Sequence, residues 1–185
     1  MAAARAEEME YMRRIGVYEE ADEDDCWKLT GKAPISTRWV DVSKDDEGKM
    51  VIRSRWVARD FKPRGEKDRE DLFAAMPPLE AKKILFRLAT LQKPRADGAK
   101  LGLLMIDVKK AHLNGRCEKD DVFVELPVEA GAKPGTCGRL RRWLYGMRPA
   151  ANGWEKDYSE KLESGLGLRK GVAAPTCFWN PATGT

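Results

Sequence analysis

The stretch LGLLMIDVKKAHLNG, residues 101–115, sets a carboxylate directly behind an apolar run. Residues 101–106 have the length and composition of a buried strand, and Asp107 is next in the chain. A carboxylate is rarely buried, because losing its hydration is costly unless a positive group meets it. The sequence therefore predicts a strand that ends by placing Asp107 either against a cation or in a turn that returns to solvent.

The composition is that of a folded chain without a membrane segment. Its 185 residues are 42% hydrophobic and 35% charged, which suits one domain with a sizeable core. No apolar run approaches the ~20 residues of a membrane span, and the first residues lack the apolar centre of a secretory signal. The single histidine and four dispersed cysteines form no zinc-binding spacing. They indicate reduced thiols, which predicts an intracellular protein of the cytoplasm or nucleus.

The net charge of +4 is unevenly distributed along the chain. Residues 1–25 carry nine acidic and three basic side chains, so the excess of positive charge lies in the remainder. Residues 49–64 hold six basic side chains and one acidic one, and residues 130–154 hold five basic and none acidic. Basic residues interleaved with Trp and Tyr favour binding to a polyanion, whereas a solvated, mildly basic surface is the alternative for each stretch alone.

The residue patterns predict an α+β fold. Helices are expected from the N-terminus to about residue 18, over residues 79–91 and over residues 150–164. Strands are expected over residues 37–43, 49–61, 101–106, 121–127 and 176–181, with a hairpin turn at 45–48. The acidic residues 19–25 and the Gly- and Pro-containing residues 129–138 are expected to be loops.

Six blocks, in one order along nearly the whole chain, resemble the reverse transcriptase of copia-type LTR retrotransposons. They are EEMEYMRRIGVYEEADEDDCWKL at 7–29, TRWV at 37–40, DEGKMVIRSRWVARDF at 46–61, DVKKAHLNG at 107–115, LYGMRPAANGW at 144–154 and EKDYSEKLESGLGLRKGVAAPTCFW at 155–179. The resemblance implies a right-hand polymerase fold with a fingers β-hairpin and an incomplete palm, an antiparallel sheet with helices on one face. It divides the chain into an N-terminal helix and acidic linker (1–36), a fingers-like region (37–95) and a palm-like region (96–185).

The resemblance assigns the carboxylate at residue 107 to catalysis. In this family the Asp at the end of the first palm strand binds Mg²⁺, so Asp107 would be a catalytic metal ligand and the backbone carbonyl of Val108 another. Two metal ions would then activate the primer hydroxyl and stabilise the leaving pyrophosphate.

The resemblance also implies nucleotide-binding residues in the hairpin, because guanidinium groups suit phosphate oxygens. Arg55, Arg53 and Lys49 align with basic positions of the family, although a basic edge strand protected from aggregation is the alternative for Arg53 and Lys49. His112 stands where the family has a Phe that blocks a 2′-hydroxyl, so sugar discrimination and packing are expected to differ. The residues expected to contact nucleic acid are Trp56, Arg59, Arg139, Arg141, Arg142 and Arg148.

The expected function is that of a fragment of an RNA-directed DNA polymerase, with an RNA or DNA template-primer and dNTP as partners. The family's Tyr-Xaa-Asp-Asp element should follow the strand at 176–181, yet no Asp or Glu follows Glu163. The chain alone is therefore expected to be inactive. A non-catalytic nucleic-acid-binding module and an inert retroelement relic are the alternatives, and the sequence indicates no oligomeric state.

Overall fold

The computed structural model describes residues 1–46, 48–62, 64, 72, 74–91, 102 and 104–182. The chain forms two compact units, one made of Met1–Phe73 and Lys110–Asp157, the other of Ala74–Lys109 and Tyr158–Thr185. Each unit joins two stretches that are distant in sequence. In the first unit, strands near the N-terminus pair with strands beyond residue 120, and the three consecutive segments expected from the sequence stay a prediction.

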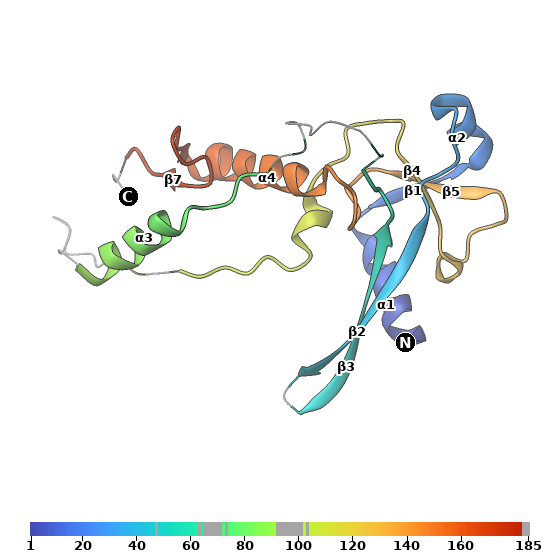
Figure 1. Ribbon diagram of the computed structural model, residues 1–185, viewed down its shortest axis with the longest axis horizontal. Coiled ribbons are helices and arrows are strands. Elements are labelled where there is room, and N and C mark those ends of the chain that lie inside the picture. The colour runs from blue at the N-terminus through green and yellow to red at the C-terminus, as the bar shows by residue number, and fades with distance from the viewer. Residues whose placement is uncertain are drawn as a thin grey trace. The chain divides into compact units, whose positions relative to one another are not determined.

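A three-stranded antiparallel sheet lies at the centre of the first unit. Its strands are β1 (Tyr18–Asp22), β5 (Thr136–Leu140) and β4 (Phe123–Glu125), in the order β1-β5-β4 (Figure 1). Most of β1 (residues 19–22) and of β5 (residues 136–138) falls in residues expected to be loops, so that expectation was wrong there. The pairing that forms them is long-range, with Tyr18 opposite Leu140.

Helix α2 (Glu23–Thr30) follows β1 directly and was also missed from the sequence. Its first turn carries Glu23, Asp24 and Asp25, and negative charge at this end is favourable because the helix dipole is positive there. The helix ends at Gly31, which adopts the left-handed conformation with a φ of 65°. The acidic cluster is thus a helix start rather than a solvated loop.

The predicted hairpin is confirmed and consists of β2 (Thr37–Asp46) and β3 (Lys49–Ala58). Trp39 lies opposite Trp56 in its register. At the tip, Gly48 has a φ of 81° and its N–H donates a hydrogen bond of 2.8 Å to the Asp45 carboxylate. Figure 1 shows the hairpin as a long twisted ribbon that extends away from the three-stranded sheet.

The core of the first unit forms where helix α1 (Ala2–Arg14) covers the base of the hairpin. Met9 and Met12 are buried in the same cluster as Trp56, whose exposed fraction is 0%. The ring of Tyr18 packs edge-on against Trp56, with 5.5 Å between ring centroids and an interplanar angle of 75°. The N-terminal helix is therefore part of the core and not an appendage.

Gly115 and Gly153 bring the blocks at 107–115 and 144–154 together, and Gly146 packs the second block against the end of the hairpin. A Cβ on Gly115 would lie 2.7 Å from the carbonyl carbon of Gly153, and one on Gly153 would lie 2.2 Å from Cδ1 of Trp143. A Cβ on Gly146 would lie 2.2 Å from the carbonyl oxygen of Ala58, next to the hydrogen bond that the Ala58 N–H donates to Tyr145. These contacts need bare backbone, so each glycine is fixed by close packing.

The remaining elements complete a mixed arrangement of helices and small antiparallel sheets, which agrees with the α+β class. They are α3 (Leu79–Leu91), the 3₁₀ turns η2 (Ala111–Asn114) and η3 (Val128–Ala130), α4 (Ala150–Glu160), its π-helical continuation η4 (Lys161–Gly165), β6 (Arg169–Lys170) and β7 (Phe178–Trp179). Strands β6 and β7 form a separate pair. Within the described ranges, no helix has the length and apolar character needed to cross a bilayer.

The predicted strand at residues 101–106 is not formed in its described part. Residues 102 and 104–108 have no regular secondary structure, and residues 101 and 103 lie outside the described ranges. Leu104, Met105 and Ile106 are 82%, 76% and 75% exposed. An apolar run indicates burial only when a partner surface covers it, and no such cover lies over these side chains in the part of the chain that is described.

Candidate nucleic-acid interface

The β2–β3 hairpin has two faces of different character. Residues paired directly across an antiparallel ladder share a face, and successive residues alternate between faces. One face carries a set of five exposed cations, which we call the basic face: Arg38, Lys44, Lys49, Arg53 and Arg55. Four valines and Asp46, which lies opposite Lys49 in the register, occupy the remaining positions of this face. Among the residues that the structure describes, none of the five cations forms an ion pair.

The opposite face of the hairpin is anchored to α1. The Asp41 carboxylate accepts hydrogen bonds of 2.6 Å from both the Arg5 guanidinium and the Ser54 hydroxyl. Arg5 also donates to Glu129 at 3.0 Å, and the indole N–H of Trp39 donates to the same carboxylate at 2.9 Å. The hydrogen bond from Arg5, followed by that from Ser54, lowers the pKa of Asp41. We call this set the Arg5 bridge; it fixes the base of the hairpin and with it the direction of the basic face.

Arg53, Arg55 and Lys49, predicted from the sequence to bind nucleotide, thus lie together on one exposed face. Sequence reasoning missed Arg38 and Lys44, which the register of the hairpin adds to that face. Arg38 and Lys44 continue the two-residue spacing of Val40 and Val42, and this period was the signal that could have found them. Trp56, predicted to contact nucleic acid, lies on the other face and is completely buried, so its ring has no surface on which a base could stack.

The basic stretch around residues 139–142 is occupied by contacts within the protein. Arg139 and Arg141 each form an ion pair of 2.9 Å with Asp120, and Arg141 also pairs with Glu19 at 2.8 Å. Arg142 donates to the backbone carbonyl oxygens of Ile15 and Asn114.

Arg139, Arg141 and Arg142 therefore tie β5 and the residues directly after it to neighbouring segments, and their contact with nucleic acid stays a prediction. The two remaining predicted contacts differ from them. Arg59 is exposed, and its backbone N–H donates to Ser36. Arg148 is half-buried, and its backbone N–H donates to the Asp60 carboxylate at 2.9 Å.

Asp107, the predicted catalytic carboxylate, is exposed in the irregular segment 104–108 of the second unit, with Val108 beside it. Mg²⁺ requires near-octahedral oxygen coordination, usually with more than one carboxylate or with substrate phosphates. Within the described ranges, no group of three or more His, Cys, Asp or Glu side chains that could hold a metal ion is present. The donors described do not make up a complete two-metal site.

His112 lies in η2, within the first unit, and is half-buried. Its ring centroid is 6.1 Å from that of Tyr145. Burial, and then the negative charge of Glu8, raises the pKa of Tyr145 to about 12. The position predicted to face a nucleotide sugar is therefore backed by a neutral aromatic side chain.

The turn that carries His112 is tied to α1 by Lys110, the residue directly before it. Lys110, with a φ of 56°, forms an ion pair with the buried Glu8, and its ammonium group lies 3.8 Å from the centroid of the Tyr11 ring. Ion pairing and the aromatic face both stabilise the lysine charge in this half-covered position. The left-handed backbone of Lys110 is thus held by side chains of the N-terminal helix.

Comparison with known proteins relates the chain, including the hairpin, to one protein family. Residues 11–171 match the family model described as reverse transcriptase (RNA-dependent DNA polymerase). The match includes the hairpin with its basic face, the block around Asp107 and the three glycine contacts. No solved structure matches the chain significantly.

Proposed function

Since this chain belongs to the reverse transcriptase (RNA-dependent DNA polymerase) family, we propose that it is part of a copia-type retrotransposon polymerase of right-hand architecture. Its reaction would be template-directed nucleotidyl transfer on an RNA or DNA template-primer. The copia-type assignment is supported by the order of the sequence blocks, of which DVKKAHLNG and LYGMRPAANGW meet through the glycine contacts.

The observation that carries the proposal is the basic face of the β2–β3 hairpin. Five cations without ion-pair partners among the described residues repel one another, and they are stabilised when phosphates lie between them. Arg53 and Arg55 offer guanidinium forks that match phosphate oxygens in a bidentate manner. We propose that this face holds the phosphates of the incoming nucleotide and of the adjacent strand.

Asp107 is proposed as one carboxylate of a Mg²⁺ site, with the Val108 carbonyl oxygen beside it. One carboxylate does not hold two ions, so these 185 residues are not expected to extend a primer alone. Primer extension by this chain would contradict that expectation. If the chain does extend a primer, loss of that activity in Asp107→Asn would support the role of Asp107 as a metal ligand.

The salt dependence of binding to an RNA–DNA duplex tests the basic face. Each phosphate contact contributes about −0.9 to the slope of log K against log salt concentration, so Arg53→Gln/Arg55→Gln should make the slope shallower by about 2. The matched control is Arg14→Gln/Lys28→Gln, which removes two exposed charges from α1 and α2. It should leave the slope unchanged.

The same titration separates the alternatives. Equal slopes for the two double variants would refute the role of the hairpin. Strong duplex binding with a steep salt slope but no extension favours a non-catalytic nucleic-acid-binding module. Absence of binding at low salt would leave only an inert relic.

A further inference from the structure

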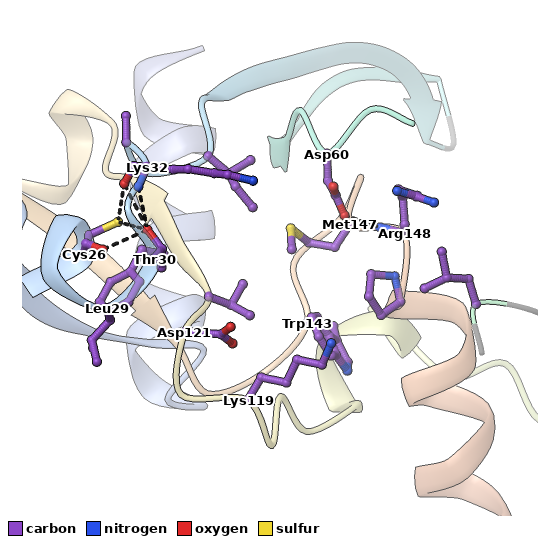
Figure 2. Close-up of a pocket in the computed structure, with 16 residues that line it drawn as sticks. Cys26, Leu29, Thr30, Lys32, Asp60, Lys119, Asp121, Trp143, Met147 and Arg148 are labelled. Atoms are coloured by element: carbon purple, nitrogen blue, oxygen red, sulfur yellow. Dashed lines mark hydrogen bonds between the residues drawn. The ribbon is translucent and has the colours of Figure 1, made fainter. Parts of the chain in front are cut away.

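A cavity of about 400 Å³ lies in the first unit, apart from the basic face (Figure 2). It is bounded by the end of α2, by residues 119–123 before and within β4, and by residues 143–149. Its apolar wall includes Val122, Phe123, Trp143 and Met147. The volume is in the range typical of sites for small molecules.

Charged side chains of both signs border this apolar wall. Figure 2 shows Lys32 and Asp121 directed into the cavity from the α2 side, with Lys119 below them extending toward Trp143. In the part of the chain that the structure describes, neither lysine forms an ion pair, and the Asp121 carboxylate has no hydrogen-bond donor. These three groups are therefore available to a ligand.

The backbone that carries these groups is held in place. Thr30 Oγ1 accepts a hydrogen bond from the Lys32 N–H at 3.1 Å and donates one to the Lys32 carbonyl oxygen at 3.0 Å. Arg139 donates to the carbonyl oxygen of Asp120, directly before Asp121, at 2.9 Å. Across the cavity, the Asp60 carboxylate is engaged by the backbone N–H of Arg148. A fixed frame of this kind lowers the entropic cost of binding.

The chemistry of the wall and rim selects the ligand. The two ammonium groups of the lysines favour an anion, and the wall with Trp143 and Met147 favours a ligand with a flat apolar face. The Asp121 carboxylate can accept hydrogen bonds from a donor on the ligand. Lys32, Lys119 and Asp121 are exposed, so a fatty acid would leave the Asp121 carboxylate hydrogen-bonded to water, and the two lysines disfavour a divalent cation. We propose that the cavity binds one nucleotide unit, free or as part of an unpaired strand, with its phosphate on Lys32 and Lys119 and its base against the wall. The inference rests on the proposed function for the class of ligand.

Asp121 gives this site a base preference. Guanine presents two adjacent N–H donors that match the two oxygens of a carboxylate, whereas the single N–H of uracil is flanked by carbonyl oxygens that a carboxylate repels. A pair of charge-assisted hydrogen bonds corresponds to a preference of about tenfold or more for GMP over UMP.

Binding and photo-crosslinking test the site in the full 185-residue chain. GMP and UMP affinities are measured by equilibrium dialysis, and 6-thioguanosine monophosphate, free and within a single-stranded oligonucleotide, is crosslinked and its attachment mapped by mass spectrometry. Crosslinks should fall within residues 119–123 or 143–148. A crosslink from the free nucleotide identifies a mononucleotide site, and one from the oligonucleotide alone identifies an unpaired strand; either supports the proposal.

Variants make the test specific. Lys32→Ala/Lys119→Ala should weaken GMP binding about tenfold or more, and Asp121→Asn should abolish the preference for GMP over UMP while UMP binding is retained. Lys133→Ala, an exposed lysine outside the cavity, is the control and should have no effect. Unchanged melting temperatures verify that the variants fold.

The proposal is overturned if neither probe crosslinks to these residues, if UMP binds as tightly as GMP, or if the lysine pair is without effect. Such a failure would leave the salt-slope result for Arg53 and Arg55 intact, because those residues lie outside the cavity. If GMP binds and crosslinks in the cavity as expected but Arg53→Gln/Arg55→Gln leaves the salt slope of duplex binding unchanged, the proposed function is refuted instead.

Discussion

The ion pair between Glu8 and Lys110 should contribute to the stability of the first unit, because each of these largely buried charges is neutralised by the other. Their side chains are 5% and 19% exposed, so removing either partner leaves the other charge largely desolvated. Breaking a buried pair costs about 3–5 kcal/mol. Lys110 keeps some solvent and the face of Tyr11, so Glu8→Leu is expected to lower the free energy of unfolding by about 3 kcal/mol, at the low end of that range.

Lys110→Met should cost at least as much, because it strands the more deeply buried Glu8 carboxylate. One oxygen of that carboxylate, Oε1, already has no hydrogen-bond partner among the described residues. The double variant Glu8→Leu/Lys110→Met replaces the pair with apolar side chains of similar size and should unfold within about 1 kcal/mol of the parent. The two single effects are thus expected to be strongly non-additive.

Urea denaturation followed by tryptophan fluorescence measures the four free energies of the cycle, since Trp56 and Trp143 are buried in the first unit. Lys109→Met is the control, because it removes the adjacent, exposed lysine and should change stability by less than about 0.5 kcal/mol. Single effects that simply add in the double variant would refute the reasoning, as would equal costs at Lys109 and Lys110.

Three further outcomes follow from other contacts. Gly146→Ala places a Cβ against the backbone at a φ of 78° and should cost about 3 kcal/mol or more, whereas Gly131→Ala, at a φ of 65° in open space, should cost about 1 kcal/mol by thermal or urea unfolding. Because Arg5 lowers the pKa of Asp41, the stability from this pair is present above the ordinary aspartate pKa of 3.8 and is lost as the pH falls through the lowered value. Unfolding measured from pH 6 downward should therefore lose more stability in the parent than in Arg5→Gln. Burial, and secondarily the neighbouring Cys26, raises the pKa of Cys137 to about 11, so a thiol reagent at pH 8 should label it only after urea unfolds the chain.

The hairpin and two helices were predictable because local signals determine them. The turn around Gly48 between two β-rich runs fixed β2 and β3, and helical periodicity placed α3 over residues 79–91 and α4 within residues 150–164. Lys49, Arg53 and Arg55 are separated by even numbers of positions along one strand, which predicts that their side chains share a face.

The central sheet was not predictable in the same way. Strand β5 contains Gly138 and only five residues, and it exists because β1 and β4 pair with both of its edges. No local pattern encodes that pairing. The prediction of a buried strand failed at residues 104–106, because apolar composition favours burial but does not show whether another part of the chain covers the segment. The contacts that Arg141 and Arg142 make within the protein were not predictable, because basic charge alone does not distinguish a ligand contact from an internal ion pair or backbone contact.

The order of strands β1-β5-β4 has a consequence for synthesis on the ribosome. Residues 18–22 emerge early, yet their partner strand, residues 136–140, is made more than a hundred residues later. Until then β1 presents an unpaired edge, and Tyr18 lacks the cover it has in the finished core. The three-stranded sheet can therefore close only after residue 140 has been translated, so its folding is late relative to the synthesis of β1.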